Sequence, residues 1–411
     1  MHVLLIHQSF AALDEPGGTR HHELARYLAD QGHRVTIIAS PVSYLTGTTQ
    51  GQRSPWVTQQ DGGAGVTILR AYTYPALHRS FPHRVASFLS FMVSSFLAGL
   101  RVKGVDLVWG TSPPIFQGAT AWALSRLKRV PFLFEVRDLW PAFAVAIGVL
   151  RSPLLIQASE WLERFLYSHA DRVIVNSPGF VEHVRSRGAR NVELVPNGAD
   201  TTMFDPEGRG DDFRDRLGIP PKDEGGAFLA LYAGAHGLSN DLGVLLAAAG
   251  LLRECREITI AFLGDGKEKP DLIDQATGMG LANVRFLPPL PKAGMPAALA
   301  AADACIAILK PVPAYTTVYP NKVFDYMAAG RPVVLAIDGV IREVVEGVKA
   351  GIAVPPGDPQ ALAEALENLA ADRQMAAAMG RRGRREVETR FDRAVIAERM
   401  ARLMEAMANR V

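Results

Sequence analysis

A length of 411 residues predicts two or three domains, each large enough to bury its own core. A hydrophobic content of 48% and a charged content of 21% are typical of a soluble globular enzyme, and a formal net charge of +2 is too small to indicate a nucleic-acid partner. Cys255 and Cys305 each lie in an apolar segment, which favours two buried thiols in a reducing compartment over a disulfide or a metal pair.

The amino-terminal half alternates between predicted strands and helices. An apolar strand at 3–6 opens the chain without the basic leader and cleavage site of a signal peptide, so we expect a cytoplasmic protein. A helix around 24–28 ends at Gly32 and leads into a strand at 35–39, which is the strand–helix–strand unit of a parallel sheet. Residues 41–65 are rich in Gly, Thr, Gln and Ser, and we expect an exposed loop there. Further strands are predicted at 66–70, 106–109, 132–135, 172–175 and 192–195.

A second series of strands and helices comes after a polar stretch at 196–226, which we interpret as a linker. The sequence therefore predicts an α/β fold with two Rossmann-like domains, over 1–200 and 201–392, and a last helix over 393–411 that crosses back to the first. The strands of the second series are predicted at 228–232, 258–263, 284–287, 304–308, 332–336 and 351–354.

The motifs of dinucleotide-dependent oxidoreductases and of P-loop nucleotidases are missing from these two halves. The Gly-x-Gly-x-x-Gly fingerprint fails at residues 7–10, and Gly264-Asp265-Gly266 has Lys269 in place of the third glycine. We also find neither a P-loop, nor the ligand spacing of a zinc site, nor an Asp-x-Asp triplet. We therefore expect that the protein requires no metal and no cofactor.

The stretch from Pro320 to Ile337 predicts a short helix, a glycine stop at Gly330 and a buried strand. Asn321 is a suitable N-cap, and Lys322 adds a charge to the positive end of the helix dipole, so this helix start could hold a diphosphate. Asp325, one turn on, could accept hydrogen bonds from a ribose diol. The simpler alternative is a solvated cap, with Asp325 only complementing the dipole.

Five separated motifs resemble those of family 4 glycosyltransferases, which have the GT-B fold. The stretch from Pro320 to Ile337 resembles the carboxyl-terminal part of the family's Glu-x7-Glu motif. Each motif is common, but five in this order span nearly the whole chain. The residues that carry the resemblance are Gly17–Ala25 with Gly32–Thr36, Asn197–Asp200, Gly264–Gly266 with Leu281–Leu287, Pro320–Ile337, and Val354–Asp358.

Residues 135–141 and 320–322 are most similar to a branch that builds bacterial surface polysaccharides, including amino-deoxyhexose (N-acetyl-fucosamine-type) transferases. The resemblance implies metal-independent transfer of a sugar from a nucleotide diphosphate donor, with a UDP-sugar favoured, and retention at the anomeric carbon. It implies a donor on the second domain, an acceptor on the first and closure of the two over a cleft. Such transferases often act on undecaprenyl-diphosphate sugars, so the expected acceptor is lipid-linked or a saccharide.

Carried over to this sequence, the resemblance assigns the ribose to Asp325 and the diphosphate to Lys322 and Asn321. Cations and N–H groups aimed at the departing diphosphate relieve the charge that grows on it. The loop at Gly17-Gly18 is a further candidate for closing on an anion, although a flexible turn is the alternative. The remaining residues expected near the donor are Thr19, Gly237, Gly264, Asp265 and Leu287.

Two departures from the family pattern bear on the donor. The first acid of the Glu-x7-Glu motif is replaced by Thr317, and the loop at 233–241 lacks the Arg and Lys that commonly clamp the diphosphate. Because that acid contacts sugar hydroxyls in the family, its loss suggests a deoxy, amino or acetamido sugar. The missing clamp would leave Lys322 as the principal cation.

Arg137 and Asp138 come directly after a predicted strand, where the family often has His-Asp facing the donor sugar. Asp138 could bind a hydroxyl of the acceptor or of the sugar, and an ion-pair network of both residues with Glu135 is an equal alternative. We name no catalytic base, because the donor phosphate itself can accept the proton in retaining transfer.

An apolar segment at 85–100 predicts an amphipathic helix that is too short to span a bilayer, since a span takes ~20 apolar residues. A core helix that covers the sheet is one interpretation. The other is peripheral contact with the inner face of the plasma membrane. Its predicted stripe is Val85, Phe88, Leu89, Met92, Phe96 and Leu100, flanked by Arg79, Arg84, Arg101 and Lys103.

Two rival functions fit the same architecture. A sugar-nucleotide 2-epimerase would release no nucleoside diphosphate in net turnover, whereas a transferase releases one per transfer. A non-catalytic sugar-nucleotide-binding subunit would bind the donor without consuming it.

Overall fold

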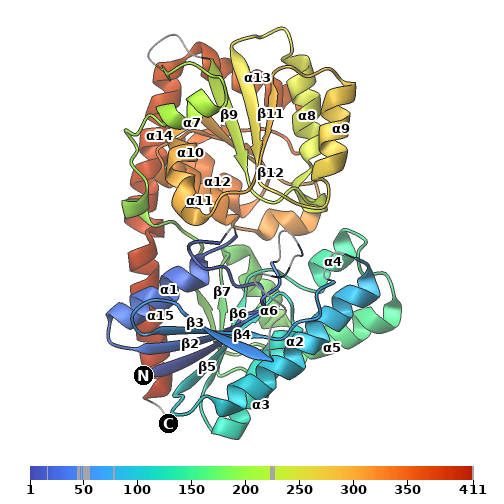
Figure 1. The fold of residues 1–411 in the computed structure, drawn as a ribbon, viewed down its shortest axis with the longest axis vertical. Helices are drawn as coiled ribbons and strands as arrows, with labels where there is room; N and C mark the ends of the chain where they lie inside the picture. Colours follow the sequence, from blue (N-terminus) through green and yellow to red (C-terminus); the bar gives the residue numbers. More distant parts are fainter. Residues whose placement is uncertain are drawn as a thin grey trace. The chain divides into compact units, whose positions relative to one another are not determined.

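Two mostly parallel sheets carry the fold of the computed structural model, which describes residues 1–15, 17–43, 47, 49, 56–76, 79–222 and 227–409 (Figure 1). The chain divides into two compact units. The first unit consists of Met1–Leu13, Gly17–Pro196 and Ala394–Val411, and Asn197–Arg393 forms the body of the second.

The sheet of the first unit has the strand order β3-β4-β2-β1-β5-β6-β7-β8 in the described residues. All neighbours are parallel except β3 and β4, which pair antiparallel. The central strands are buried along their whole length, as a parallel sheet covered on both faces requires. The strands are β1 (His2–Ile6), β2 (Arg34–Ala39), β3 (Val57–Asp61), β4 (Val66–Ala71), β5 (Leu107–Ser112), β6 (Phe132–Val136), β7 (Arg172–Val175) and β8 (Val192–Leu194).

The edge strand β3 corrects the expectation of one loop over 41–65. Its sequence, Val-Thr-Gln-Gln-Asp, is polar and mostly exposed, so no apolar alternation marked it as a strand. Pairing with β4 supplies its hydrogen bonds instead. Residues 44–46, 48 and 50–55 of the expected loop lie outside the described residues.

Two layers of helices cover this sheet. On one face α1 (Arg20–Asp30) and α15 (Arg393–Ala408) pack on β1 and β2 through Leu24, Leu28, Met400 and Met404. On the other face α3 (Phe116–Lys128) packs on β5, with α2 (Phe81–Arg101) and α5 (Pro153–His169) packed against α3. The short helices α4 (Ala142–Ala146) and α6 (Val181–Ser186) complete the unit.

Helix α2 has 21 residues, so it is longer than the predicted segment, and the expectation that it is too short to span a bilayer is wrong for its length. Among the described residues, Pro82–Arg101 is long and apolar enough to cross a membrane. Within its most apolar stretch, 33% is buried inside the protein. The apolar stripe predicted from the sequence does not coincide with one exposed face of the helix. Its residues Phe88, Met92 and Phe96 are half-buried, and Phe91, outside the predicted stripe, is buried. The large apolar side chains on the exposed face are Leu89, Val93, Leu97 and Leu100.

The second unit has an all-parallel sheet in the order β11-β10-β9-β12-β13-β14. Helices α8, α9 and α13 cover one face, and α7, α10, α11 and α12 cover the other (Figure 1). The strands are β9 (Phe228–Ala233), β10 (Ile258–Leu263), β11 (Val284–Leu287), β12 (Ala304–Ile308), β13 (Val333–Ala336) and β14 (Gly351–Ala353). The helices are α7 (Asp211–Arg216), α8 (Leu242–Leu251), α9 (Lys269–Gly278), α10 (Met295–Ala301), α11 (Asn321–Ala328), α12 (Val340–Gly347), α13 (Pro359–Ala371) and α14 (Arg373–Glu386).

The strand orders place one topological switch point in each unit. In the second unit the order reverses at β9, which lies between β10 and β12, and in the first it reverses at β1, which lies between β2 and β5. Ligands of open α/β sheets bind outside the carboxyl ends of the strands at such points. The loops after β1, β5, β9 and β12 are therefore the places to look for a site.

Helix α11 begins one residue earlier than predicted. Pro320 is its N-cap and Asn321 is its first helical residue, so the expectation that Asn321 is the N-cap is wrong. Asn321 instead donates through Nδ2 to Asp325 Oδ2 (3.5 Å), and its Oδ1 accepts from Arg393 Nη2 (3.3 Å). Gly330 ends the helix in a left-handed conformation (φ +68°), as the sequence predicted.

Candidate functional site

Lys322 lies at the carboxyl end of β9 in the second unit. Its Nζ donates to the hydroxyl of Tyr232 (2.9 Å) and lies 4.1 Å from the centre of that ring. Residue 234 is glycine with φ +150°, and a Cβ there would come within 2.5 Å of Nζ, so a side chain at 234 would displace the ammonium group. Burial lowers the pKa of Lys322 to about 7. The structure therefore brings this ammonium group to the switch point of the sheet.

The turn after β10 lies against the turn after β9. A Cβ on Gly264, whose φ is +146°, would come within 1.9 Å of the carbonyl oxygen of Gly234. Glycine is therefore required at 264 for this close approach of two backbones. The N–H of His236 donates to the carbonyl of Asp265 (2.8 Å), and the Asp265 carboxylate accepts from the N–H of Gly266 (2.8 Å).

Lys269, which occupies the third position of the failed fingerprint, ties the ends of β10 and β11 together. Its Nζ donates to the carbonyls of Gly264 (2.7 Å) and Leu287 (2.8 Å). Gly264, Asp265 and Leu287 therefore lie together at the carboxyl edge of the sheet. These hydrogen bonds give Gly264 and Asp265 a structural role that exists without any ligand.

The loop that begins at Gly237 crosses the switch point between β9 and β12. Gly237 precedes a single turn over Leu238–Asn240. The carbonyl of Ser239 accepts from the N–H of Lys310 (3.0 Å), and its hydroxyl accepts from the hydroxyl of Tyr315 (2.6 Å). His236 is buried just before this turn, and neither of its ring nitrogens has a partner among the described residues. Burial, together with the charges of Lys269 and Lys322, lowers the pKa of His236 to about 4, so the ring is neutral.

Asp325 does not stand alone on its helix face. Both of its carboxylate oxygens accept from Nζ of Lys292, at 2.8 and 2.7 Å, and the side chains of the pair are 15% and 7% exposed. Nothing in the sequence had indicated Lys292, which lies in a single turn between β11 and α10. The simple dipole role considered for Asp325 is therefore incomplete.

Thr317, at the position of the family's first acid, closes a short helical turn over Pro313–Thr317 after β12. Its hydroxyl donates to the carbonyl of Ala314 (2.7 Å). The side chain at this position therefore brings a hydroxyl in place of a carboxylate.

In the first unit, a buried carboxylate organises the ends of β5 and β6. Glu135 is fully buried and accepts from Arg20 Nε (3.1 Å), His21 Nε2 (2.8 Å) and Trp109 Nε1 (3.1 Å). Burial alone would raise the pKa of Glu135, but the neighbouring His21, Arg20 and Arg137 hold it well below its usual range. Burial lowers the pKa of His21 to about 4 despite Glu135. Arg20 also donates to the carbonyls of Val195 and Pro196.

This arrangement corrects the ion-pair network considered for Arg137, Asp138 and Glu135, because Glu135 pairs with Arg20 and His21 instead. Arg137 donates through Nη2 to the carbonyl of Pro113 (3.4 Å), and its Nε has no partner among the described residues. Asp138 is exposed, yet the protein around its carboxyl raises its pKa to about 6, opposed by Arg137. Solvent access limits this shift, so its upward direction is the part that bears on function.

The loop at Gly17-Gly18-Thr19 leads into α1. Gly17 has φ +147°, and a Cβ on it would approach the Ala11 side chain at 2.9 Å, whereas a Cβ on Gly18 would meet open space. The Thr19 hydroxyl donates to Glu23 (2.5 Å). Arg20 anchors the end of this loop to Glu135, a link that the charge pattern of the sequence did not reveal.

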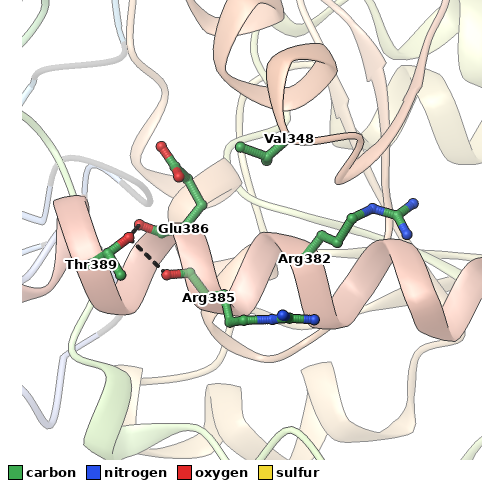
Figure 2. Close-up of a pocket in the computed structure, with 5 residues that line it drawn as sticks. All are labelled: Val348, Arg382, Arg385, Glu386 and Thr389. Carbon is green, nitrogen blue, oxygen red and sulfur yellow. Dashed lines mark hydrogen bonds between the residues drawn. The ribbon is translucent and has the colours of Figure 1, made fainter.

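The structure also contains a shallow pocket of about 250 Å³ in the second unit, lined by Val348, Arg382, Arg385, Glu386 and Thr389 (Figure 2). None of the predicted site residues lines it. Figure 2 shows Arg382 and Arg385 along one helix, and Arg382 donates through Nε to the carbonyl of Lys349 (3.0 Å). Because the lining residues come from 348 and 382–389, this pocket is separate from the strand ends described above.

Two family models match separate parts of the chain. Residues 17–198 match the glycosyl transferase 4-like domain, and residues 227–372 match the glycosyl transferases group 1. Together the two regions take in most of the chain, one in each structural unit.

Individual proteins extend this likeness. An Escherichia coli (strain K12) protein named as a putative colanic acid biosynthesis glycosyl transferase, WcaI, is 26% identical over 83% of this chain and 85% of its own length. The sucrose-phosphate synthase of Thermosynechococcus elongatus has a similar structure, with a TM-score of 0.79, 20% identity and complete coverage of both chains. The Anabaena protein HepE, solved in complex with UDP-glucose, gives a TM-score of 0.71 at 20% identity over 99% of this chain and 100% of its own.

The two matched domains, and the structural neighbours that share the two sheets, agree with the residue motifs that suggested this family. The chain is therefore a glycosyltransferase of family 4 with the GT-B fold.

Proposed function

We propose that this enzyme transfers a sugar from a nucleotide diphosphate donor to a lipid-linked or saccharide acceptor, with retention at the anomeric carbon and without a bound metal. One observation carries the proposal: the ammonium group of Lys322 lies over Tyr232 at the switch point of the second unit. A half-buried cation at the carboxyl end of a central strand suits an anionic ligand.

The diphosphate of the donor would contact Lys322 and the first N–H groups of α11. In the transfer, the bond between the anomeric carbon and the diphosphate oxygen breaks, and negative charge grows on that oxygen. A fixed cation and a helix N-terminus stabilise this charge without reorganisation during the step. The loop at Gly17–Thr19 in the first unit is proposed as a further anion contact.

The acceptor hydroxyl would form the new bond on the face from which the diphosphate leaves, and its proton would pass to the departing phosphate oxygen. No side chain is then required as the base. Asp138 and Arg137 are proposed to contact the acceptor or the sugar, because Asp138 is exposed and its pKa is raised.

A UDP-sugar is the favoured donor, since the HepE structures contain UDP and UDP-glucose. Thr317 offers a hydroxyl where the family pattern has an acid, and this hydroxyl is used within its own turn. We therefore propose a deoxy, amino or acetamido sugar of the N-acetyl-fucosamine type, for which a carboxylate partner is not needed.

The likeness to WcaI supports a role in bacterial surface polysaccharide synthesis, with an undecaprenyl-diphosphate-linked acceptor at the inner face of the plasma membrane. The exposed face of α2, formed by Leu89, Val93, Leu97 and Leu100, supports such a location. Helix α5 adds Leu154, Leu155 and Trp161, which are 74%, 42% and 64% exposed. Apolar faces of this kind, flanked by Arg101 and Arg164, suit an anionic lipid surface.

A donor screen tests the proposal. Sugars carried on UDP, GDP and dTDP are incubated with the protein and a lipid-diphosphate sugar as acceptor, and release of nucleoside diphosphate is measured together with the anomeric configuration of the product. We expect acceptor-dependent release with acetamido or deoxy sugars and an unchanged configuration. Interconversion of two donors without release would indicate an epimerase, and donor binding without turnover would indicate a non-catalytic subunit. Preference for glucose or mannose would contradict the proposed role of Thr317.

A further inference from the structure

We infer that Lys292 is a positioning residue for the donor: it holds the carboxylate of Asp325 in the place in which that carboxylate binds the ribose diol. The inference rests on the proposed function, because it concerns the nucleotide of the proposed donor. It concerns a residue outside the motifs that led to the family.

The geometry of the pair is well defined. Nζ of Lys292 lies 2.8 Å from Oδ1 and 2.7 Å from Oδ2 of Asp325, so one ammonium group bridges both oxygens and fixes the plane of the carboxylate. Asn321 donates to Oδ2 from one turn earlier on α11 (3.5 Å). The carboxylate is therefore oriented from two sides.

Lys292 itself is held in place by its surroundings. It is 6% exposed, and Nζ lies 5.3 Å from the ring centre of the buried Phe204. The single turn of Lys292–Gly294 comes after β11, whose last residue, Leu287, is fixed to the turn after β10 through Lys269. Few rotamers are open to a lysine in such a site, so it acts as a rigid support.

The charge of Lys292 matters as much as its position. A carboxylate that is mostly removed from water is strongly destabilising unless a countercharge lies beside it. Asp is also one methylene shorter than the Glu of the family motif, so its reach toward a ligand is limited. The bridging ammonium group of Lys292 supplies that countercharge and orients the carboxylate. A carboxylate can accept about four hydrogen bonds in all, so the pair leaves acceptor capacity for a ligand.

The alternative is a purely structural ion pair that joins α11 to the turn after β11. The two interpretations differ in one measurable quantity, which is how strongly the protein prefers a ribose diol to a sugar without it. A structural pair changes stability alone. A positioning pair changes this preference.

The experiment measures dissociation constants of UDP, GDP, ADP and CDP and of their 2′,3′-dideoxy counterparts. In the wild-type protein we expect the ribonucleotide to bind about tenfold or more tightly than its dideoxy counterpart, the size typical of hydrogen bonds to a charged acceptor. Lys292→Met and Asp325→Asn should each reduce this ratio to near one. The double variant should reduce it no further, because the two residues act as one unit.

One further variant keeps the test decisive should Lys292→Met fold poorly. Lys292→Arg retains the charge beside Asp325 and should recover part of the ratio. Lys222→Met is the matched control, because Lys222 is a half-buried lysine of the second unit that also faces a carboxylate, 3.8 Å from Asp303. It should lower stability and leave the ratio unchanged.

A folded Lys292→Met protein with the wild-type ratio would overturn the inference. So would a wild-type protein that binds a nucleoside diphosphate without any preference for the diol, although donor binding by the second unit would then stand. Binding of none of the four nucleotides to the wild-type protein would overturn the proposed function itself, and the inference with it.

Discussion

The side chain of Lys322 can be either a charged ammonium group or a neutral amine near neutral pH. Burial lowers its pKa to about 7, while its contact with the Tyr232 hydroxyl keeps Nζ at the end of β9. An anion beside Nζ favours the charged form and raises that pKa again. Binding of the proposed donor is therefore linked to proton uptake by this residue.

This linkage predicts the pH dependence of donor binding. The affinity for a nucleotide sugar should be greatest below about pH 7, where Lys322 is already charged, and should fall as the pH rises from about 7 toward the higher pKa of the complex, by at most about tenfold per pH unit. A nucleotide sugar is the right probe, because its diphosphate has no proton that titrates there. Isothermal titration calorimetry across neutral and mildly alkaline pH measures the effect.

Lys322→Met should bind the nucleotide sugar weakly, with no such pH dependence. Lys349→Met, which alters an exposed lysine of the same unit, should behave as the wild-type protein does. A flat profile in the wild-type protein would exclude proton uptake by Lys322 on binding.

The residues of the site differ in how far the sequence revealed them. Lys322 and Asp325 were indicated by a helix start with a strand after it, which is a local pattern. Lys292, Tyr232 and His236 were not, because their importance arises from contacts with residues far along the chain. Sequence spacing carries no information about such contacts.

At the scale of elements, the turns after β9 and β10 are built as one unit. Gly264 and Gly234 bring the two backbones together, and His236 and Asp265 hydrogen-bond across the junction. The glycine pair at 264 and 266 had suggested a weak nucleotide fingerprint. The close packing of these two turns already requires glycine at both positions, whether or not a nucleotide binds.

Gly264→Ala should therefore destabilise the second unit, because the added Cβ would lie 1.9 Å from a backbone oxygen and the backbone is in a region that favours glycine. We expect a loss of several kcal/mol, at the large end of single substitutions. Gly243→Ala, in α8 with nothing within 4 Å of the new Cβ, should instead stabilise by up to about 1 kcal/mol. Thermal unfolding followed by circular dichroism compares them, and equal melting temperatures would contradict the prediction.

The exposed face of α2 leads to a prediction about membranes. Changing Leu89, Val93 and Leu97 to Ser should reduce sedimentation with anionic phospholipid vesicles severalfold, because these side chains are 41%, 51% and 41% exposed and are not needed in the core. A control with Leu251, Ile273 and Met279 changed to Ser removes three exposed apolar side chains of the second unit. Equal sedimentation of both variants and the wild-type protein would remove this face as the contact.

At the scale of the whole molecule, the first unit is completed by the end of the chain. Ile396, Met400 and Met404 of α15 are buried in the same cluster as Val3 and Leu5 of β1. The amino-terminal unit therefore depends on residues from the opposite end of the sequence.

This dependence can be measured selectively, because all five tryptophans lie between Trp56 and Trp161 and report on the first unit alone. Met404→Ala should lower the free energy of unfolding seen by tryptophan fluorescence in urea by about 2–5 kcal/mol. Val395→Ala, which alters an exposed residue at the start of the same helix, should change it by no more than about 0.5 kcal/mol. An unchanged urea midpoint for Met404→Ala would show that α15 adds little to this core.

The sequence by itself determined the fold class, the family and the helix–glycine–strand unit that carries Lys322 and Asp325, because these depend on local periodicity, on turn residues and on short motifs. It did not reveal the edge strand β3, whose polar residues lack a strand pattern, or the shift of the exposed stripe on α2. Only the tertiary structure decided the partners of the charges: Lys292 for Asp325, Arg20 and His21 for Glu135, and Tyr232 for Lys322. The physical reason is that a hydrogen bond or an ion pair is set by distance in space, and the two residues of each such contact come from different elements of one unit.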